Sequence, residues 1–206
     1  MTFFPGFTTG VLWEDLVRRY ESADVSDLHA LLAGSFSSGA RLLELGCGSG
    51  RDAAHMLANG FDVIASDAVQ EMLDAAAACH PALAGRLCRL CLPRDLTPSL
   101  GPFEGVYAVA TLMHLTRPAI QEVFSGIRRI LVPEGRLFFS VPLHRDDVAA
   151  DECDAKGRRF TAMTCAAWTG ICRHTGFDII TSTVSSDGLG RKSFAWLNCL
   201  AVTRRK

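Results

Sequence analysis

Two acidic residues and a group of glycines stand at spacings that suit ligand binding. Glu44 comes directly before a segment that reads G-C-G-S-G, with glycine at positions 46, 48 and 50. Asp67 closes the next apolar run, where nucleotide-binding folds place a ribose-binding carboxylate. Glycines let a ligand lie close to the backbone. The pattern therefore predicts a nucleoside site.

A dinucleotide is a poorer candidate ligand for this turn. The fingerprint G-x-G-x-x-G needs its third glycine at position 51, which is Arg51. A glycine turn also serves tight packing of a strand against a helix, without any ligand. Asp67 has an alternative role as the N-cap of the following helix. An unpaired Glu44 on a buried strand would be costly, so a purely structural role is harder to argue for Glu44.

The turn lies within a repeated alternation of strands and helices. Residues 41–45 and 61–67 are apolar runs of strand length, and a helix that begins at Asp52 and is closed by Gly60 joins them. This order is a βαβ unit. Two amphipathic helices precede it within the first forty residues. Further strands are expected at 86–92, 104–112, 135–141, 177–184 and 194–202.

The connections between these runs predict the sheet. The first five strands alternate with helices and should be parallel, whereas the last two share a short loop and should form an antiparallel hairpin at the edge. Residues 142–161 are polar and without clear period, so a loop is expected there. We predict a single domain over 1–206, with a helical cap over 1–40 and a cofactor-binding α/β core over 41–206.

Composition excludes several classes of protein. The formal net charge is −1 and no half of the chain is strongly basic, which argues against nucleic-acid binding. No apolar run is long enough to cross a membrane and no signal peptide is evident, so a cytoplasmic, soluble protein is expected. Cys88 and Cys91 form a C-x-x-C inside an apolar run, with no second pair at metal-ligand spacing. The eight cysteines are therefore interpreted as reduced, mostly core residues, and no metal is expected.

Three segments resemble the class I S-adenosylmethionine-dependent methyltransferases: LLELGCGSGRDA, SDAVQEML and IRRILVPEGRLFFSV. The segments GSGRD, ATLMHL and FAWLNCLAV are similar to a subgroup of small bacterial enzymes that includes tellurite-resistance-type proteins. The resemblance implies a Rossmann-like three-layer sandwich, whose seven-stranded, mostly parallel sheet ends in a C-terminal antiparallel hairpin. It also implies S-adenosylmethionine as the cofactor.

By its motif positions, the resemblance assigns roles to particular residues. Asp67 would bind the ribose hydroxyls, and Glu44 would reach the methionine ammonium. Asp95 would approach the adenine amine with Leu96 beside the ring, although Asp95 has an equal alternative as a loop turn residue. The full set of implied cofactor residues is Glu44, Gly46, Cys47, Gly48, Gly50, Arg51, Asp67, Ala68, Asp95, Leu96, Ala110 and Thr111.

His114 is the one candidate catalytic residue. In the family the end of strand four faces the transferring methyl, and a histidine there could deprotonate an acceptor or hold it by a hydrogen bond. The alternative is an ordinary histidine near the next helix, or a contact to that helix's cap. The acceptor should lie under the N-terminal helices and the segment after strand five. Its candidate contacts, besides His114, are Trp13, Tyr20, His144, Arg145, Arg159, Phe160, Arg191 and Trp196.

The resemblance implies an S-adenosylmethionine-dependent methyltransferase that acts by in-line displacement. A small-molecule acceptor is expected rather than nucleic acid or a membrane, because the charge is near neutral and no NPPY-like run follows strand four. The protein would be a monomer or a homodimer. The alternatives are a nucleotide-cofactor oxidoreductase, a non-catalytic S-adenosylmethionine-binding regulatory module, and another reaction on the same cofactor such as intramolecular cyclisation.

Overall fold

A computed structural model describes residues 11–144, 152, 159–186 and 194–204. Within these residues seven strands form one sheet in the order β3-β2-β1-β4-β5-β7-β6. The strands are β1 (Arg41–Leu45), β2 (Asp62–Asp67), β3 (Leu87–Arg89), β4 (Phe103–Val109), β5 (Leu131–His144), β6 (Phe177–Ser186) and β7 (Ala195–Thr203). The neighbours from β3 to β5 pair in parallel, and β7 is antiparallel to both β5 and β6. The predicted mostly parallel sheet with a C-terminal antiparallel hairpin is confirmed.

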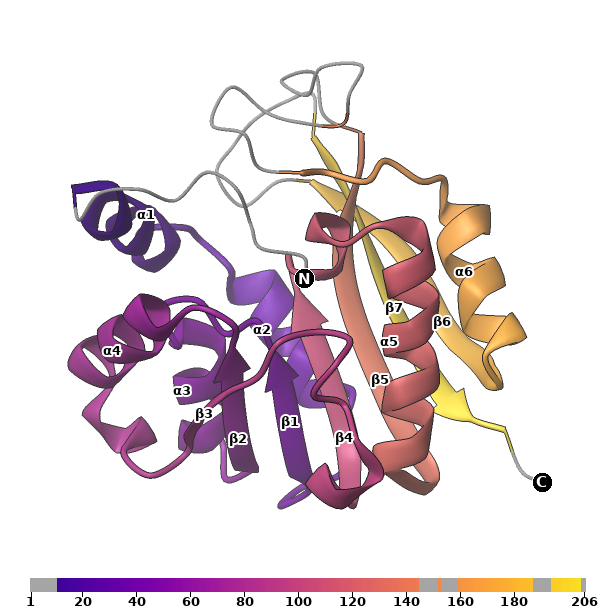
Figure 1. Cartoon of the computed structure of the whole chain (residues 1–206), viewed down its shortest axis with the longest axis horizontal. Helices are drawn as coiled ribbons and strands as arrows, with labels where there is room; N and C mark the ends of the chain where they lie inside the picture. Colours follow the sequence, from indigo (N-terminus) through magenta and orange to yellow (C-terminus); the bar gives the residue numbers. More distant parts are fainter. Residues whose placement is uncertain (1–10, 145–151, 153–158, 187–193, 205–206) are drawn as a thin grey trace.

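Helices cover both faces of the sheet (Figure 1). They are α1 (Val11–Glu21), α2 (Ser26–Gly34), α3 (Arg51–Ala58), α4 (Gln70–Cys79), α5 (Arg117–Ile130) and α6 (Cys165–His174). Helices α2, α3 and α4 share one apolar cluster with the strands, and α5 and α6 share another on the opposite face. In Figure 1, α1 lies beyond this layer, above α4 and near the ends of β1 and β2.

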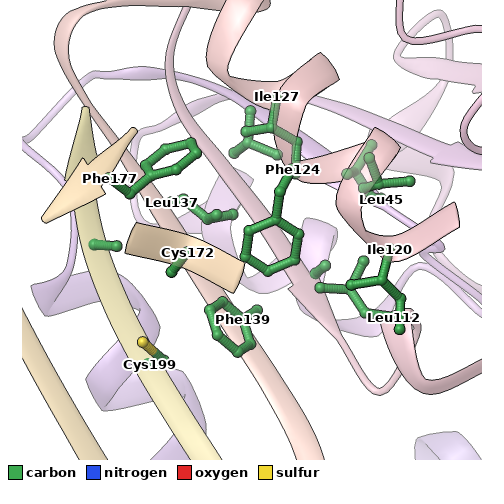
Figure 2. Close-up of a cluster of buried hydrophobic side chains, with 14 of the residues drawn as sticks. Leu45, Leu112, Ile120, Phe124, Ile127, Leu137, Phe139, Cys172, Phe177 and Cys199 are labelled. Carbon is green, nitrogen blue, oxygen red and sulfur yellow. The ribbon is translucent and has the colours of Figure 1, made fainter. Parts of the chain in front are cut away.

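The apolar core under α5 and α6 follows from the helical spacing of its side chains. Ile120, Val123, Phe124 and Ile127 recur on one face of α5 and are fully buried. The Thr116 hydroxyl caps the helix by accepting a hydrogen bond from the Ala119 amide at 3.5 Å. Figure 2 shows Phe124 lying between α5 and the sheet, where it meets the Phe139 ring edge-to-face at 5.4 Å.

Several strand boundaries differ from those predicted. β4 stops at Val109 rather than 112, because Ala110 adopts a φ of 54° and Leu112–His114 form a 3-10 turn. β3 is shorter than predicted, since this edge strand pairs only with residues 65–67 of β2. β5 begins before Gly135 and continues through residue 144, into the region predicted as a loop, because β7 pairs along it.

The described residues contain neither a membrane-spanning helix nor a cluster suited to a metal. No helix among them is long and apolar enough to cross a bilayer, and no group of three or more of their His, Cys, Asp or Glu side chains is arranged to hold a metal ion. The described cysteines are all free thiols. Burial raises the pKa of the Cys47 and Cys88 thiols above their ordinary values, so neither is an activated nucleophile.

Candidate functional site

The glycine turn joins β1 to α3 at the carboxyl end of the sheet. The amides of Gly46 and Cys47 both donate to the Ser66 carbonyl of β2 at 2.8 Å. Gly46 has a φ of 75°, and a Cβ at this position would collide with the Thr111 side chain. Gly50, with a φ of 83°, precedes α3 and faces Leu83 and the α4 residue Ala76. The glycines are thus required by backbone conformation and by packing, as well as by any ligand.

Glu44 is a buried carboxylate with little protein support. Its residue is 1% exposed, and the Tyr107 hydroxyl donates to its Oε2 at 3.4 Å, a long hydrogen bond. Burial raises the pKa of Glu44 well above its ordinary value, and the nearby negative charge of Asp52 raises it further. A cation placed beside this carboxyl group would relieve both effects. The site is therefore suited to a positively charged ligand group.

Asp67 is held in place by two backbone amides. Its Oδ2 accepts from the Gly48 N–H at 3.0 Å, and its Oδ1 accepts from the Val69 N–H at 3.0 Å. Burial raises the pKa of Asp67, and these backbone hydrogen bonds partly offset the rise. The N-cap of α4 is Val69, so Asp67 is not the helix cap considered from the sequence. The carboxylate instead links the glycine turn to the end of β2.

The end of β4 meets the glycine turn directly. The Thr111 hydroxyl contacts the carbonyls of Gly46 at 3.2 Å and Val109 at 3.0 Å. Ala110 donates its N–H to the Ser140 carbonyl of β5 at 2.9 Å while holding a positive φ. A non-glycine residue in this conformation is strained, which is common at functional sites. The carboxyl ends of β1, β2 and β4 therefore converge at one edge of the sheet, as parallel strands require.

His114 is joined to the segment that follows β5. Its Nδ1 lies 2.7 Å from the Arg159 carbonyl oxygen, and its ring meets Phe160 edge-on at 4.7 Å. A carbonyl only accepts, so Nδ1 carries a proton and is the donor in this hydrogen bond. The cap of α5 is Thr116, so His114 is not the cap contact that the sequence left open.

Asp95 and Leu96 lie in protein contacts of their own. The Asp95 carboxylate accepts from the Cys91 N–H at 2.8 Å and from the Arg94 Nε at 2.7 Å. These contacts match the turn role that the sequence left open for Asp95. Leu96 is 2% exposed and packs under Gly126 of α5. No described contact joins either residue to the glycine turn.

Arg51 also has protein partners. Its Nε donates to Asp52 Oδ1 at 2.8 Å, and its Nη1 donates to the Tyr20 carbonyl of α1 at 2.6 Å. The Tyr20 ring lies over Gly48, where an added Cβ would be 3.2 Å from its Cε2. The structure thus brings Tyr20 of α1 to the glycine turn. It gives Arg51 contacts to protein where the sequence suggested a cofactor contact.

Comparison with known proteins decides the family. A profile described as a methyltransferase domain matches residues 17–182, which are most of the chain. The chain belongs to this family. The methyltransferase family that the sequence segments resemble is confirmed. This family assignment argues against the nucleotide-cofactor oxidoreductase that the sequence left as an alternative.

This methyltransferase is similar to one curated relative in sequence and to several solved structures in fold. An uncharacterized methyltransferase of Synechocystis is 31% identical over 114 residues, or 54% of this chain and 50% of the relative. The chain thus spans about half the length of the curated relative that it matches. The 1,6-didemethyltoxoflavin-N1-methyltransferase of Burkholderia thailandensis has a TM-score of 0.74 at 20% identity, covering 97% of this chain and 94% of that chain. The glycopeptide N-methyltransferase MtfA has a TM-score of 0.70 at 17% identity, with coverages of 88% and 91%. At such identities the two structures show the fold alone.

The candidate acceptor residues of the methyltransferase are only partly described. Arg145 and Arg191 lie outside the described residues, as do the side chains of Trp13 and His144. Arg159 is paired with Glu152 through Nη1 at 2.9 Å. The β7 residue Trp196 lies opposite Pro142 of β5, at the carboxyl end of that strand.

Sequence reasoning missed the polar partners of the site. Tyr107 lies opposite Glu44 in the register of β1 and β4, a relationship that appears only once the strands are paired. Asp52 and His29 join Arg51 in a buried network, with His29 Nε2 at 2.8 Å from Asp52 Oδ1. Asp52 stands beside Arg51 in the sequence, which was an available signal. Nothing in the sequence indicated that His29 would reach it from another helix.

Proposed function

We propose that the methyltransferase transfers a methyl group from S-adenosylmethionine to a small-molecule acceptor by in-line displacement. The observation that carries the proposal is Glu44, a buried carboxylate whose long hydrogen bond from Tyr107 leaves it short of partners. An amino acid ammonium beside it would supply the missing positive charge. The bound cofactor supplies the sulfonium-activated methyl group. In this proposal residues 41–206 bind the cofactor, and the cap over 1–40 covers the acceptor.

Asp67 would accept hydrogen bonds from the ribose hydroxyls. An ionised carboxylate has about four acceptor positions, and the two backbone amides at 3.0 Å use two of them. The remaining positions suit a vicinal diol. Because the two amides fix the carboxylate, little side-chain entropy is lost when a ligand binds. The backbone of Gly46, Cys47, Gly48, Gly50 and Ala68 would lie along the cofactor.

Ala110, Thr111 and His114 would line the space where the methyl group moves. Thr111 is tied to Gly46, which fixes the distance between the end of β4 and the glycine turn. Because His114 Nδ1 donates to the Arg159 carbonyl, Nε2 is the nitrogen of the neutral ring that would accept a proton or a hydrogen bond from an acceptor. Alignment and exclusion of water supply much of the rate in such a displacement, so a strong base is not required.

The charge of the chain and the proteins of similar fold both favour a small-molecule acceptor. A near-neutral chain with no basic excess is poorly suited to a phosphate backbone. The Burkholderia neighbour was solved with bound 1,6-didemethyltoxoflavin, a small molecule, and S-adenosylhomocysteine. The segment that carries Arg159 and Phe160 lies against His114, which gives a small acceptor both a polar and an aromatic wall. We therefore place a small molecule between this segment and the cap.

The test is a mass-spectrometric screen of small candidate acceptors with S-adenosylmethionine. The proposal predicts a methylated product that accumulates in equal amount with S-adenosylhomocysteine. Tight binding of S-adenosylhomocysteine, with no methylated product and no cofactor turnover in a broad acceptor mixture, would instead favour the regulatory module. A product that is an isomer of the acceptor, formed without cofactor consumption, would favour the cyclisation alternative.

A further inference from the structure

A buried polar network joins the N-terminal helices to the start of α3. Arg51 holds Asp52 through two contacts, from Nε at 2.8 Å and from Nη2 at 3.2 Å. His29 of α2 contacts the same carboxylate at 2.8 Å, and its ring stacks on that of His55 at 3.9 Å. The Asp52 side chain is 8% exposed. Helices α2 and α3 thus meet at one buried carboxylate.

Arg51 extends this network to α1. Its Nη1 donates to the Tyr20 carbonyl at 2.6 Å. Tyr20 lies in the last turn of α1, where the helix dipole favours a cation, and its carbonyl also accepts from the Ala23 N–H at 3.4 Å. Glu21, the next residue, contacts His80 after α4 at 3.2 Å. The end of α1 is therefore held at two points, by Arg51 of α3 and by His80 after α4.

The same end of α1 touches the glycine turn. The Tyr20 ring lies over Gly48, and the Gly48 amide donates to Asp67 at 3.0 Å. Arg51 itself is the first residue of α3, directly after Gly50. A displacement of α1 would thus act on the backbone that holds Asp67, and a displacement of that backbone would act on α1.

We propose that Arg51 is a positioning residue that holds α1 over the cofactor turn, so that cofactor binding and the placement of α1 stabilise each other. The inference rests on the proposed function, because it takes this turn as the cofactor site and the cap as the acceptor's cover. Coupling of this kind is reciprocal: a ligand that orders α1 is bound more tightly because α1 is ordered. The acceptor would therefore meet a preformed wall only after the cofactor has bound.

The chemistry requires arginine at this position. The guanidinium contacts both oxygens of Asp52 and still reaches a carbonyl on another helix, whereas a lysine ammonium is a point charge without this forked geometry. Burial alone would raise the pKa of Asp52, but the hydrogen bonds from His29 and Arg51 hold it below its ordinary value. Asp52 is thus an ionised, buried group that depends on its partners.

A second arginine provides a matched control. Arg136 of β5 donates from Nη1 to the Ser35 carbonyl, just after α2, at 2.8 Å. This contact also ties the N-terminal segment to the core by one arginine–carbonyl hydrogen bond. It lies at the amino end of the sheet, since Arg136 pairs with Gly105 near the start of β4. Loss of this contact should leave the cofactor turn unchanged.

The experiment is hydrogen–deuterium exchange of the α1 amides, read by mass spectrometry with and without S-adenosylhomocysteine. In the wild-type chain the ligand should slow exchange over residues 14–21 by roughly fivefold or more. In Arg51→Met this slowing should be lost and ligand affinity should fall about tenfold. Arg51→Lys should be intermediate. Arg136→Met should behave as the wild-type chain in both measurements.

Several results would overturn the inference. One is that S-adenosylhomocysteine slows exchange of the α1 amides in Arg51→Met as much as in the wild type. Another is that Arg136→Met loses this slowing and ligand affinity as Arg51→Met does. If Arg51→Met fails to fold, Asp52→Asn provides the same comparison. This substitution weakens the hydrogen bonds that orient the Arg51 guanidinium but keeps the arginine itself. Failure of the wild-type chain to bind S-adenosylhomocysteine would contradict the proposed function itself. Binding without any effect on exchange in α1 would contradict only the role of Arg51.

Discussion

Tyr107 and Glu44 lie opposite each other on neighbouring strands, and the tyrosine hydroxyl donates to the carboxylate at 3.4 Å inside the sheet. Burial, with the negative charge of Glu44, raises the pKa of the Tyr107 hydroxyl, so the phenol remains a donor. A long hydrogen bond from one neutral donor does not offset the burial of an ionised carboxylate. We interpret the pair as a cation site that the protein itself leaves incomplete.

Glu44→Gln should separate ligand binding from folding. The amide keeps the shape of the side chain but removes its charge, so S-adenosylhomocysteine affinity should fall by about tenfold or more. The free energy of unfolding should stay unchanged or rise by about 1 kcal/mol, because a buried acid is removed. Calorimetric titration and thermal unfolding measure the two effects. Glu104→Gln, on the neighbouring strand β4, is the control and should leave affinity unchanged. A Gln variant that binds as the wild type does would contradict the role of Glu44.

Binding of S-adenosylhomocysteine should release a proton. The pKa of Glu44 in the free protein is raised well above its ordinary value, chiefly by burial. An ammonium beside it favours the ionised form, so binding lowers the pKa and affinity rises with pH until the free group is ionised. Titration calorimetry in buffers of different ionisation enthalpy measures the proton count. Asp67 also has a raised pKa, so Glu44→Gln is needed to isolate the effect. Equal proton release in that variant would refute the assignment.

Asp67→Ala should weaken cofactor binding by roughly 1–3 kcal/mol, through the lost charged hydrogen bonds. Asp67→Asn should lose less, since the amide oxygen still accepts from one of the two backbone amides now held at 3.0 Å. Calorimetric affinities for S-adenosylhomocysteine and for adenosine measure both losses. If adenosine binding is untouched in both variants, Asp67 does not contact the ribose.

Gly46→Ala should destabilise the fold through contact with Thr111. A Cβ at position 46 would collide with that side chain, in addition to the strain of a φ of 75°. Gly60→Ala is the matched control, because Gly60 has a φ of 85° but nothing within 4 Å of an added Cβ. Gly46→Ala should cost at least about 1 kcal/mol more than Gly60→Ala, and Thr111→Ala should recover part of the difference. Equal unfolding free energies for the two glycine variants would be inconsistent with the packing described.

The succession of strands and helices along the chain was predictable because periodicity and connection length constrain it, and the site was predictable where it follows that succession. Glu44, Gly46 and Asp67 stand at strand ends, so the alternation of strands and helices brings them to one edge. The end of β4 was misjudged, because Ala110 adopts a positive φ that its residue type does not signal. The contacts of Arg51 with Tyr20 and of Asp52 with His29 could not be predicted, since they depend on how separate helices pack.

His114→Ala should lower turnover more than cofactor affinity. The ring contacts the Arg159 carbonyl, in the segment after β5, at 2.7 Å. Removal of a general base or acceptor contact costs about 100-fold or more in rate. Single-turnover rates with the acceptor found by screening, beside calorimetric affinities, make the comparison. His174→Ala, at the exposed end of α6, is the control. Equal turnover in His114→Ala would leave the histidine a structural residue.

The most direct test of the central claim uses methyl-labelled S-adenosylmethionine and a cell extract separated into small molecules, proteins and nucleic acids. The wild-type methyltransferase should transfer label to the small-molecule fraction, and Glu44→Gln should transfer far less at the same cofactor concentration. Label that appears only in the protein or nucleic-acid fraction would contradict the proposed small-molecule acceptor. An absence of label in every fraction, from a chain that binds S-adenosylhomocysteine, would contradict methyl transfer itself.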